Sequence, residues 1–515
     1  MASIMNFGDS HIAVLAVSVV AVGTLASVLF YVIQSALLHP LAKYPGPLLG
    51  KFTDLWAVYH GWRGDLAHTL ARLHEQHGDF IRFGPNRMSI NSAEALEKIY
   101  GFKANTRKSK WYIQFSADPR HPATNTEIDP AEHKCKRAFL NKGFSGHSMK
   151  LLEPKILDTI ETWKTHCITP SPDNDGWSTP RDMANWAVYL TNDVMGAVVF
   201  SKSFSLSESL EHRWLAQAVP LSTRSKYAGC FAPWLIINKL DRYLYPSLTA
   251  WRLKLRSFSM EQLSARIARK DDPTLHDFFR FILESYSATS PSPLDARTLG
   301  SESNLLVGAG GDTTSTSIAA TLFYLCRNPA PLSRVVSELR EKFTSVEEIV
   351  PGPALDECKY LRACIDESMR LAPPAPSPLL REVQDGGLTI GKEHFAAGTD
   401  VAVTTFALHR HKDHFPEPLS YRPERWEAKG EELEKAKSAF APFSIGARQC
   451  IGMRLAYMEA MAALGRVLWE FEIRTAPGKE GEGVDADGLY KLVDSFGTEK
   501  RGPWVQFRRR EEGSA

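Results

Sequence analysis

One thiol near the C-terminus stands in a setting that suits a metal ligand. Cys450 lies between Gly446 and Gly452, directly before an apolar pattern typical of a helix. A thiolate at a helix start faces unpaired backbone N–H groups and the positive end of the helix dipole, and both lower its proton affinity. Gly446 permits a tight turn, and Gly452 leaves room for a flat group against the first helical turn. The residues favour a deprotonated sulfur that binds a metal.

Two further residues of this stretch indicate which metal group it would bind. Arg448 offers a fork of donors to an acidic group beside the sulfur, and Phe443 could shield the sulfur from water. A haem with one axial cysteine uses both features, with the arginine on a propionate. The alternative is that Cys450 is one more buried thiol, as most intracellular cysteines are. Five positions within residues 443–452 carry residue types that suit a haem with an axial cysteine, and chance is a poor explanation for that combination.

A second candidate group lies inside residues 299–327, which have the pattern of a buried helix. Three glycines stand within residues 308–311, and each costs about 1 kcal/mol relative to alanine in a helix interior, so some requirement must keep them. Their missing side chains would let a flat cofactor and a small ligand come close. Asp312 and Thr313 follow, a carboxylate and a hydroxyl that could handle protons. The alternative is a helix kink without a catalytic role.

These two stretches resemble the signatures of the cytochrome P450 family. Residues 443–452 match its Phe-x-x-Gly-x-Arg-x-Cys-x-Gly haem loop at every fixed position. Residues 309–314 match the Ala/Gly-Gly-x-Asp/Glu-Thr-Thr/Ser motif of its oxygen-side helix without a gap. The resemblance implies haem b with an axial cysteine thiolate, and it places these residues at the cofactor: Gly310, Phe443, Arg448, Cys450 and Gly452.

The resemblance also implies the catalytic roles of the acid–alcohol pair. Splitting the O–O bond of O2 needs two protons, delivered in a pocket that otherwise stays dry. Carried over, Thr313 supplies a hydroxyl beside the oxygen-binding position, and Asp312 gates protons to it. A thiolate on the other face of the haem pushes electron density toward the same bond.

Further basic residues are implied as contacts of the haem propionates. His133 and Arg137 lie one turn apart on a predicted short helix, and Arg381 follows a proline-rich bend. For the first two, the alternative is a solvated basic face, since Lys134 and Lys136 stand among them. The family often has Trp where this chain has His133.

A charged cluster is predicted to support the cysteine loop. Glu367 and Arg370 are three residues apart, on one helix face and within ion-pair reach. Arg425 lies in a Pro-Glu-Arg-Trp segment that matches the family pattern. The resemblance implies a buried Glu-Arg-Arg cluster of these three residues, and such clusters specify geometry more than they add stability.

The N-terminus reads as a membrane anchor. Residues 12–38 contain no charged side chain, and twenty-two apolar helical residues span about 33 Å, enough to cross a bilayer. A cleaved signal peptide is the alternative, but the basic leading region is missing and the apolar stretch is too long. Positive charge begins at Lys43, which places the rest of the chain in the cytosol. The predicted division is a tail at 1–11, a transmembrane anchor at 12–38, a proline-rich hinge at 39–50 and one haem-thiolate domain at 51–515.

Length and composition limit the number of domains and the classes of partner that the chain could have. With 515 residues and 43% hydrophobic content, the chain exceeds one ordinary domain and predicts two or three domains or one large one. A net charge of +2 gives no reason to expect nucleic acid. Seven scattered cysteines without Cys-x-x-Cys indicate neither disulfides nor zinc, but reduced thiols facing the cytosol. The resemblance implies the single large domain, mostly α-helical with small β-sheets at one side (α+β).

Local patterns predict a few further elements. Residues 80–83 and 88–91 read as a β-hairpin around a Gly-Pro-Asn turn. Residues 104–130 are polar and proline-punctuated, which indicates a long loop. Residues 231–237 form an apolar patch, either core or a membrane-dipping segment. Ser290–Pro293 marks a surface loop.

The function implied is monooxygenation of a lipophilic small molecule, with one oxygen atom of O2 leaving as water. Electrons would come from NADPH through cytochrome P450 reductase, with cytochrome b5 as an additional donor, at the endoplasmic reticulum membrane. Around His409-Arg410 the chain is similar to fungal members of secondary metabolism. The alternatives are a haem-thiolate isomerase, dehydratase or peroxygenase, and a non-catalytic haem binder. Substrate choice is expected to lie in residues 104–130, 215–245, 373–381 and 493–496.

Overall fold

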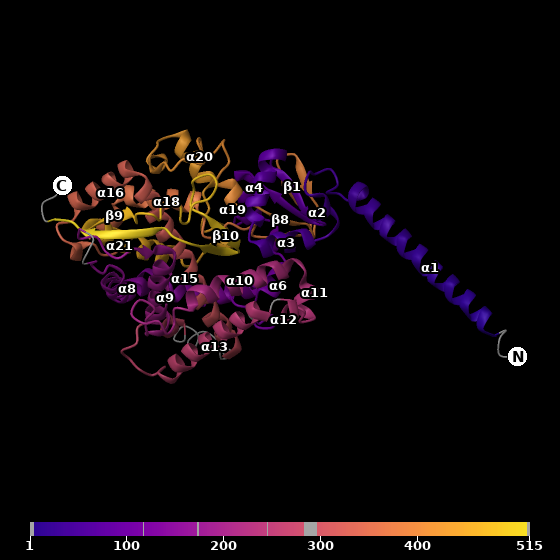
Figure 1. The fold of residues 1–515 in the computed structure, drawn as a ribbon, viewed down its shortest axis with the longest axis horizontal. Helices are drawn as coiled ribbons and strands as arrows, with labels where there is room; N and C mark the ends of the chain where they lie inside the picture. The colour runs from indigo at the N-terminus through magenta and orange to yellow at the C-terminus, as the bar shows by residue number, and fades with distance from the viewer. Residues whose placement is uncertain (1–4, 117, 172–174, 245, 283–295, 512–515) are drawn as a thin grey trace.

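The computed structural model describes residues 5–116, 118–171, 175–244, 246–282 and 296–511. The predicted surface loop at Ser290–Pro293 and the first four residues of the predicted tail lie outside this part of the chain. Helices make up most of the described chain, which confirms the mostly α-helical (α+β) class (Figure 1). The five-stranded sheet lies near the base of the N-terminal helix, and the three-stranded sheet lies near the C-terminus (Figure 1).

The long helices build the body of the domain. They are α1 (Met5–Ile33), α4 (Leu66–His77), α7 (Pro130–Gly143), α8 (Gly146–Cys167), α9 (Met183–Phe200), α10 (Leu215–Phe231), α13 (Pro246–Ala268), α15 (Ala296–Arg327), α16 (Pro329–Lys342), α18 (Lys359–Leu371) and α21 (Met453–Glu470). The shorter helices are α2 (Leu48–Phe52), α3 (Leu55–Arg63), α5 (Ala93–Tyr100), α6 (Trp111–Phe115), α11 (Pro233–Ile237), α12 (Asp241–Leu244), α17 (Pro353–Asp356), α19 (Thr405–Leu408) and α20 (Glu431–Ala439). Single turns of other helix types are η1 (Gln34–Leu38), η2 (Val346–Glu348), η3 (Pro423–Trp426) and η4 (Gly446–Arg448).

The strands form four small sheets. The five-stranded sheet has the order β1 (Phe80–Gly84), β2 (Arg87–Ile90), β8 (Asp400–Ala402), β5 (Arg381–Val383) and β3 (Thr106–Lys108). The three-stranded sheet has the order β4 (Arg181–Asp182), β12 (Trp504–Arg509) and β9 (Phe471–Thr475). Two separate pairs are β6 (Leu388–Ile390) with β7 (Glu393–Phe395) and β10 (Leu492–Ser495) with β11 (Gly497–Lys500). The antiparallel pairing of β1 with β2 confirms the predicted hairpin.

The prediction of one long loop at residues 104–130 was wrong in part. This segment contains β3, which pairs with β5 so that Lys108 stands opposite Arg381. It also contains α6, whose Trp111 stacks on Phe115 and on Phe496 near the C-terminus. The polar, proline-rich composition concealed both elements because their partners are distant in sequence.

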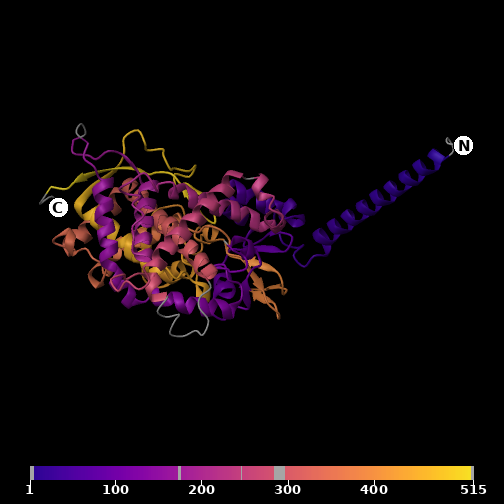
Figure 2. The same cartoon turned by 90° about the horizontal axis from the view of Figure 1, so that it is seen from below.

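Helix α15 runs through the centre of the domain and packs closely on α9 (Figure 2). A Cβ added at Gly310 would lie 2.3 Å from the sulfur of Met195, and one at Gly311 would lie 2.5 Å from Nδ2 of Asn192. Real Cβ contacts are not that short, so both glycines are required by the contact between the two helices. The space that each glycine leaves receives a side chain of α9. Gly310, which we expected to make room for a cofactor, also lines the cavity described below.

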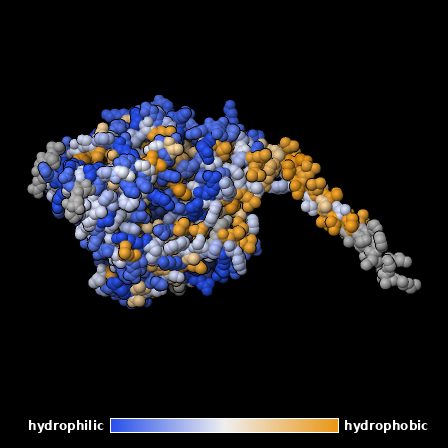
Figure 3. All heavy atoms as spheres, viewed as in Figure 1, coloured by the Kyte–Doolittle hydropathy of each residue, from blue (hydrophilic) through white to orange (hydrophobic). Residues whose placement is uncertain are grey.

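The N-terminal helix extends away from the domain (Figures 1 and 2). Residues Val14–Leu38 are long and apolar enough to cross a membrane, and their large apolar side chains are exposed, whereas Ser35 is buried (Figure 3). The base of the helix is held to the domain by three side-chain contacts. Tyr31 donates to the carbonyl of Phe52 (2.5 Å), Ser35 donates to that of Lys51 (2.5 Å), and Arg82 donates to that of Ser35 (2.8 Å).

Candidate active site

A cavity of about 300 Å³ lies between α15 and the loop that precedes α21. Both stretches that the sequence singled out contribute to its walls. The predicted site residues that line it are His133, Arg137, Gly310, Thr313, Arg381, Phe443, Arg448, Cys450 and Gly452. Asp312, the remaining predicted catalytic residue, is absent from this lining. The fold therefore brings the thiol of Cys450, the hydroxyl of Thr313 and a set of basic groups to the same space.

The cysteine loop owes its shape to a tight turn. Gly446 has a φ of +72°, and a Cβ there would lie 2.0 Å from the carbonyl oxygen of Tyr100, so no other residue fits. The backbone N–H of Cys450 donates to the carbonyl of Phe443 (2.9 Å), which closes the loop. At Gly452 the position of a Cβ is 3.9 Å from the sulfur of Cys450 and open otherwise, which leaves the predicted space beside the sulfur.

The thiol of Cys450 differs from the prediction in one respect. The residue is exposed at the cavity, but desolvation by the surrounding protein atoms raises the pKa of its thiol above the ordinary cysteine value. The backbone N–H of Gly452, the charge of Arg137 and the N–H of Met453 act in the predicted, opposite direction, but desolvation outweighs them. A bound metal ion deprotonates a coordinating thiol outright, so the local dipoles assist a ligand but do not make one alone. Of the seven cysteines, all within the described residues, only Cys450 lines the cavity.

One edge of the cavity collects cations without carboxylates. Arg137 donates to the carbonyl of Gln449 (2.7 Å), Arg381 to that of Leu380 (3.0 Å), and Arg448 to those of Glu127 (2.6 Å) and Ile128 (3.1 Å). Lys108 joins them and donates to the carbonyl of Asn125. Among the described residues no ion pair joins these cations to a carboxylate.

The charges in this cluster act on one another. Burial, and then the charges of Arg381 and Arg448, hold the pKa of Lys108 well below its usual value. Burial, and then mainly Arg448, lowers the pKa of His133 to about 3, so this imidazole is neutral. Such a cluster is costly unless an anion neutralises it, and the two propionates of a haem supply that charge. The residues present therefore fit a haem beside Cys450.

Lys108 is a site residue that the sequence did not reveal. It stands in a segment read as a polar loop, and nothing in its local sequence separates it from a surface lysine. Its placement follows from the pairing of β3 with β5, which sets it beside Arg381. Only recognition of that long-range strand pair would have identified it.

The predicted acid–alcohol pair points in two directions. Thr313 lines the cavity, and its hydroxyl donates to the carbonyl of Ala309 one turn earlier (2.9 Å), which leaves its oxygen lone pairs free to accept. Asp312 turns toward β11, where its carboxylate pairs with Lys500 (3.2 Å) and accepts from the N–H of Thr498 (3.3 Å). The Thr313 hydroxyl therefore faces the first cavity, and the Asp312 carboxylate is directed toward β11.

A second cavity, of about 160 Å³, adjoins the first along Ala309 and Thr313. All four stretches in which we expected substrate choice contribute to its lining. They do so through Phe115, Ala123, Asn125 and Thr126; through Val219, Ser222, Thr223 and Lys226; through Ala375; and through Phe496. Asp312 also lines this second cavity, so it is the place where acid, hydroxyl and a small molecule could meet.

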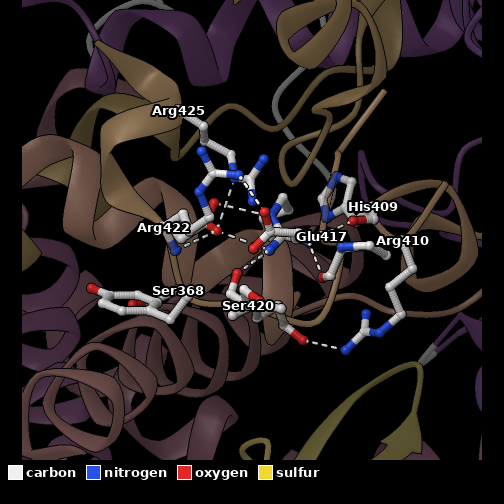
Figure 4. A network of polar contacts seen from close by, with 12 residues as sticks. Ser368, His409, Arg410, Glu417, Ser420, Arg422 and Arg425 are labelled. Carbon is white, nitrogen blue, oxygen red and sulfur yellow. Dashed lines mark hydrogen bonds and ion pairs between the residues drawn. The ribbon is translucent and has the colours of Figure 1, made fainter. Parts of the chain in front are cut away.

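The three residues of the predicted charged cluster lie together and are at most 2% exposed. Figure 4 shows the polar network around Arg425 and His409. Glu367 accepts from Arg370 at 2.8 and 2.9 Å and from Arg425 at 3.0 Å. Arg370 also donates to the carbonyl of His409 (2.9 Å), whose ring nitrogen Nε2 accepts the backbone N–H of Ala441 (3.1 Å). Ala441 lies two residues before the cysteine loop, so His409 connects the cluster to the start of that loop through one hydrogen bond on each side.

A comparison with family models decides the class. The Cytochrome P450 model matches residues 41–493. The chain belongs to the cytochrome P450 family. Members of this family bind haem through a cysteine thiolate, so haem is the cofactor of this chain as well.

Several fungal cytochrome P450 proteins are similar over nearly the whole chain. Cytochrome P450 monooxygenase poxM of Penicillium oxalicum is 36% identical over 479 residues, 93% of this chain and 92% of the relative. Cytochrome P450 monooxygenase atnE of Emericella nidulans is 36% identical over 487 residues, 92% of each. Cytochrome P450 monooxygenase apf7 of Gibberella fujikuroi is 34% identical over 499 residues, 92% of this chain and 94% of the relative. The predicted resemblance to fungal cytochrome P450 enzymes is confirmed, and this chain is an oxidoreductase of the monooxygenase type.

Proposed function

We propose that this cytochrome P450 is a membrane-anchored monooxygenase that inserts one oxygen atom from O2 into a lipophilic small molecule. The observation that carries the proposal is that Cys450 and Thr313 line one cavity from two elements, with unpaired cations at its edge. NADPH would supply the electrons through cytochrome P450 reductase, with cytochrome b5 as an additional donor. The relatives named above support a place in fungal secondary metabolism.

Named residues would hold the haem. Cys450 would ligate the iron, and Phe443 would cover the sulfur, as its ring packs on Tyr457 at the loop. Arg137, Arg381, Arg448 and Lys108 would hold the propionates, with neutral His133 as a hydrogen-bond partner. The bound haem-thiolate supplies O2 activation, and the protein supplies position, dryness and protons.

The proton path divides between two residues. The Thr313 hydroxyl faces the cavity and can accept a hydrogen bond there while it donates to Ala309. The Asp312 carboxylate lies on the other side of α15, held by Lys500, and borders the second cavity. A proton would reach Asp312 first and then the hydroxyl, either directly or through ordered water.

The surface near the anchor supports binding to the endoplasmic reticulum membrane, with the catalytic domain in the cytosol. Half of the apolar stretch 231–237 is core, because Phe231 and Leu235 are buried. The other half is exposed and continues the apolar surface at the base of α1 (Figure 3). The large exposed apolar residues there are Leu48, Leu49, Leu55, Tyr59, Trp234, Ile237, Tyr243 and Leu244. A lipid surface is the natural partner of such a patch.

Two measurements test the proposal. Reduced, CO-bound protein should show the red-shifted Soret band of a trans thiolate, and Cys450→Ser should abolish it. A normal band in that variant would assign the iron to another residue. With reductase and NADPH, the intact protein should consume O2; a haem-thiolate isomerase, dehydratase or peroxygenase, or a non-catalytic haem binder, would not.

A further inference from the structure

The second cavity contains a cation that the proposed function does not use. Lys226 lies on α10, is 8% exposed, and lines this cavity together with Asp312 and Thr313. No hydrogen bond or ion pair joins its ammonium group to another residue in the described part of the chain. The side chain is largely buried and its ammonium group borders the cavity, so an anion bound in the cavity could serve as its partner.

The charged groups around Lys226 make this need greater. Burial lowers the pKa of Lys226 to about 8, and the like charges of Arg252 and Arg256 on α13 add to the effect, while the Cys230 thiol opposes it. Most Lys226 side chains are still protonated at pH 7. The one carboxylate that lines the same cavity, Asp312, is already paired with Lys500 at 3.2 Å.

The remaining lining contains both polar and apolar side chains. Ser222 stands four residues before Lys226, on the same face of α10, and its neighbour Thr223 also lines the cavity. Leu305 and Phe496 supply apolar wall that continues into the first cavity, which Thr313 also lines. A molecule with an anionic end and an apolar body matches this distribution.

We propose that the substrate of this enzyme carries a carboxylate that pairs with Lys226 and an apolar body that extends toward Thr313. A carboxylate is the group that complements a buried ammonium, and the ion pair forms in a place shielded from water. Anchoring one end of the molecule fixes which carbon faces the reacting side. This inference rests on the proposed function and adds the chemical class of the substrate to it.

The experiment uses the compound that accumulates when the gene is removed from its host, together with the methyl ester of that compound. Full-length, haem-loaded protein is assayed in vesicles with reductase and NADPH. The compared proteins are the wild type, Lys226→Met, Lys226→Arg and Lys150→Met, an exposed lysine on α8 that serves as the control. The CO-bound band of each variant reports whether the haem site is intact.

The compound is expected to contain a carboxylic acid. Its methyl ester should have at least a tenfold higher KM with the wild type. Lys226→Met should raise the KM for the acid at least tenfold but not for the ester, and Lys226→Arg should restore most of the loss. Lys150→Met should match the wild type throughout.

Three results would overturn the inference and leave the monooxygenase standing. They are conversion of a compound with no acidic group, equal KM values for acid and ester, and an unchanged KM in Lys226→Met. If Lys226→Met loses its CO-bound band, the comparison of acid with ester on the wild type decides the question alone. If wild-type protein with a normal band consumes no O2 with any compound, the proposed function fails instead.

Discussion

Lys500 of β11 places its ammonium nitrogen 3.2 Å from Oδ1 of Asp312 on α15. Both side chains are less than a tenth exposed, so the pair is well shielded from salt and water. The hairpin of β10 and β11 thus fixes the acid that the sequence associates with proton delivery. Lys500 could not have been identified from the sequence, because it lies 188 residues from its partner.

The first prediction concerns this pair. Asp312→Asn should slow NADPH and O2 consumption by at least tenfold, because proton delivery is throttled. Lys500→Met should slow it as well, since the carboxylate is no longer held, and the double variant should be no slower than the slower single one. Lys491→Met, an exposed lysine next to the same hairpin, is the control. Strictly additive losses would show that Lys500 acts independently of Asp312.

The second prediction concerns Thr313. In Thr313→Ala the thiolate loop and the cavity walls remain, so the CO-bound band and substrate binding should change little. Without this hydroxyl, protons should release the reduced oxygen as hydrogen peroxide instead of splitting the O–O bond. NADPH and O2 should still be consumed, but hydrogen peroxide should replace most of the product. Thr313→Ser keeps the hydroxyl and should retain most of the coupling. Full product per NADPH in Thr313→Ala would remove the role proposed for this residue.

A third prediction concerns the point at which the anchor can be removed. Deletion of residues 1–33 leaves the contact between Ser35 and Arg82, whereas deletion of residues 1–38 removes it. Arg82 is fully buried, and losing a partner there costs about 1–3 kcal/mol. Both shortened proteins should leave membranes in large part, but the second should unfold a few degrees lower in a thermal scan. Identical midpoints would mean that water replaces Ser35 without cost.

A fourth prediction concerns acid stability. Burial, followed by the charges of Arg370 and Arg410, lowers the pKa of His409 to about 3, and burial lowers that of His74 to about 4. Each group binds a proton in the unfolded chain below about pH 6.5 but not in the folded one. The contribution of these two histidines to the free energy of unfolding is therefore complete above pH 6.5 and is lost progressively as the pH falls toward 4.

The test of this effect is His409→Gln, which keeps an acceptor near the N–H of Ala441. The free energy of unfolding is measured in urea between pH 4 and pH 7. It should fall less steeply with decreasing pH in this variant, because unfolding takes up as much as one proton fewer than in the wild type. His77→Gln, on the exposed end of α4, should leave the slope unchanged. Equal slopes for His409→Gln and wild type would show that His409 is already charged in the folded protein.

The sequence allowed us to predict those site residues that lie close together within one short segment of the chain. Cys450, Arg448 and Phe443 were found because they lie within one short loop, and Thr313 because its motif lies within one helix. The purpose of Gly310 was not visible, because it depends on Met195 of another helix. The rise in the Cys450 pKa was missed for a similar reason, since desolvation is a property of the assembled fold.

Distant pairings explain the rest of what was missed. Lys108 reaches the site through the pairing of β3 with β5. Lys226 lines the second cavity without a carboxylate partner among the described residues. In each case a residue type that is usually solvated is enclosed by elements far away in the chain. Spacing rules describe neighbours on one helix or strand, and they carry no information about such enclosure.

The hydrogen bonds from Tyr31, Ser35 and Arg82 make the N-terminal helix and the domain turn as one piece. A transmembrane helix adapts to a thicker or thinner bilayer by changing its tilt. With the proposed membrane anchor, such a change would rotate the catalytic domain and alter how deeply Trp234 and Leu48 sit in the lipid. Bilayer thickness thus becomes a variable that sets the angle at which a lipophilic molecule meets the enzyme.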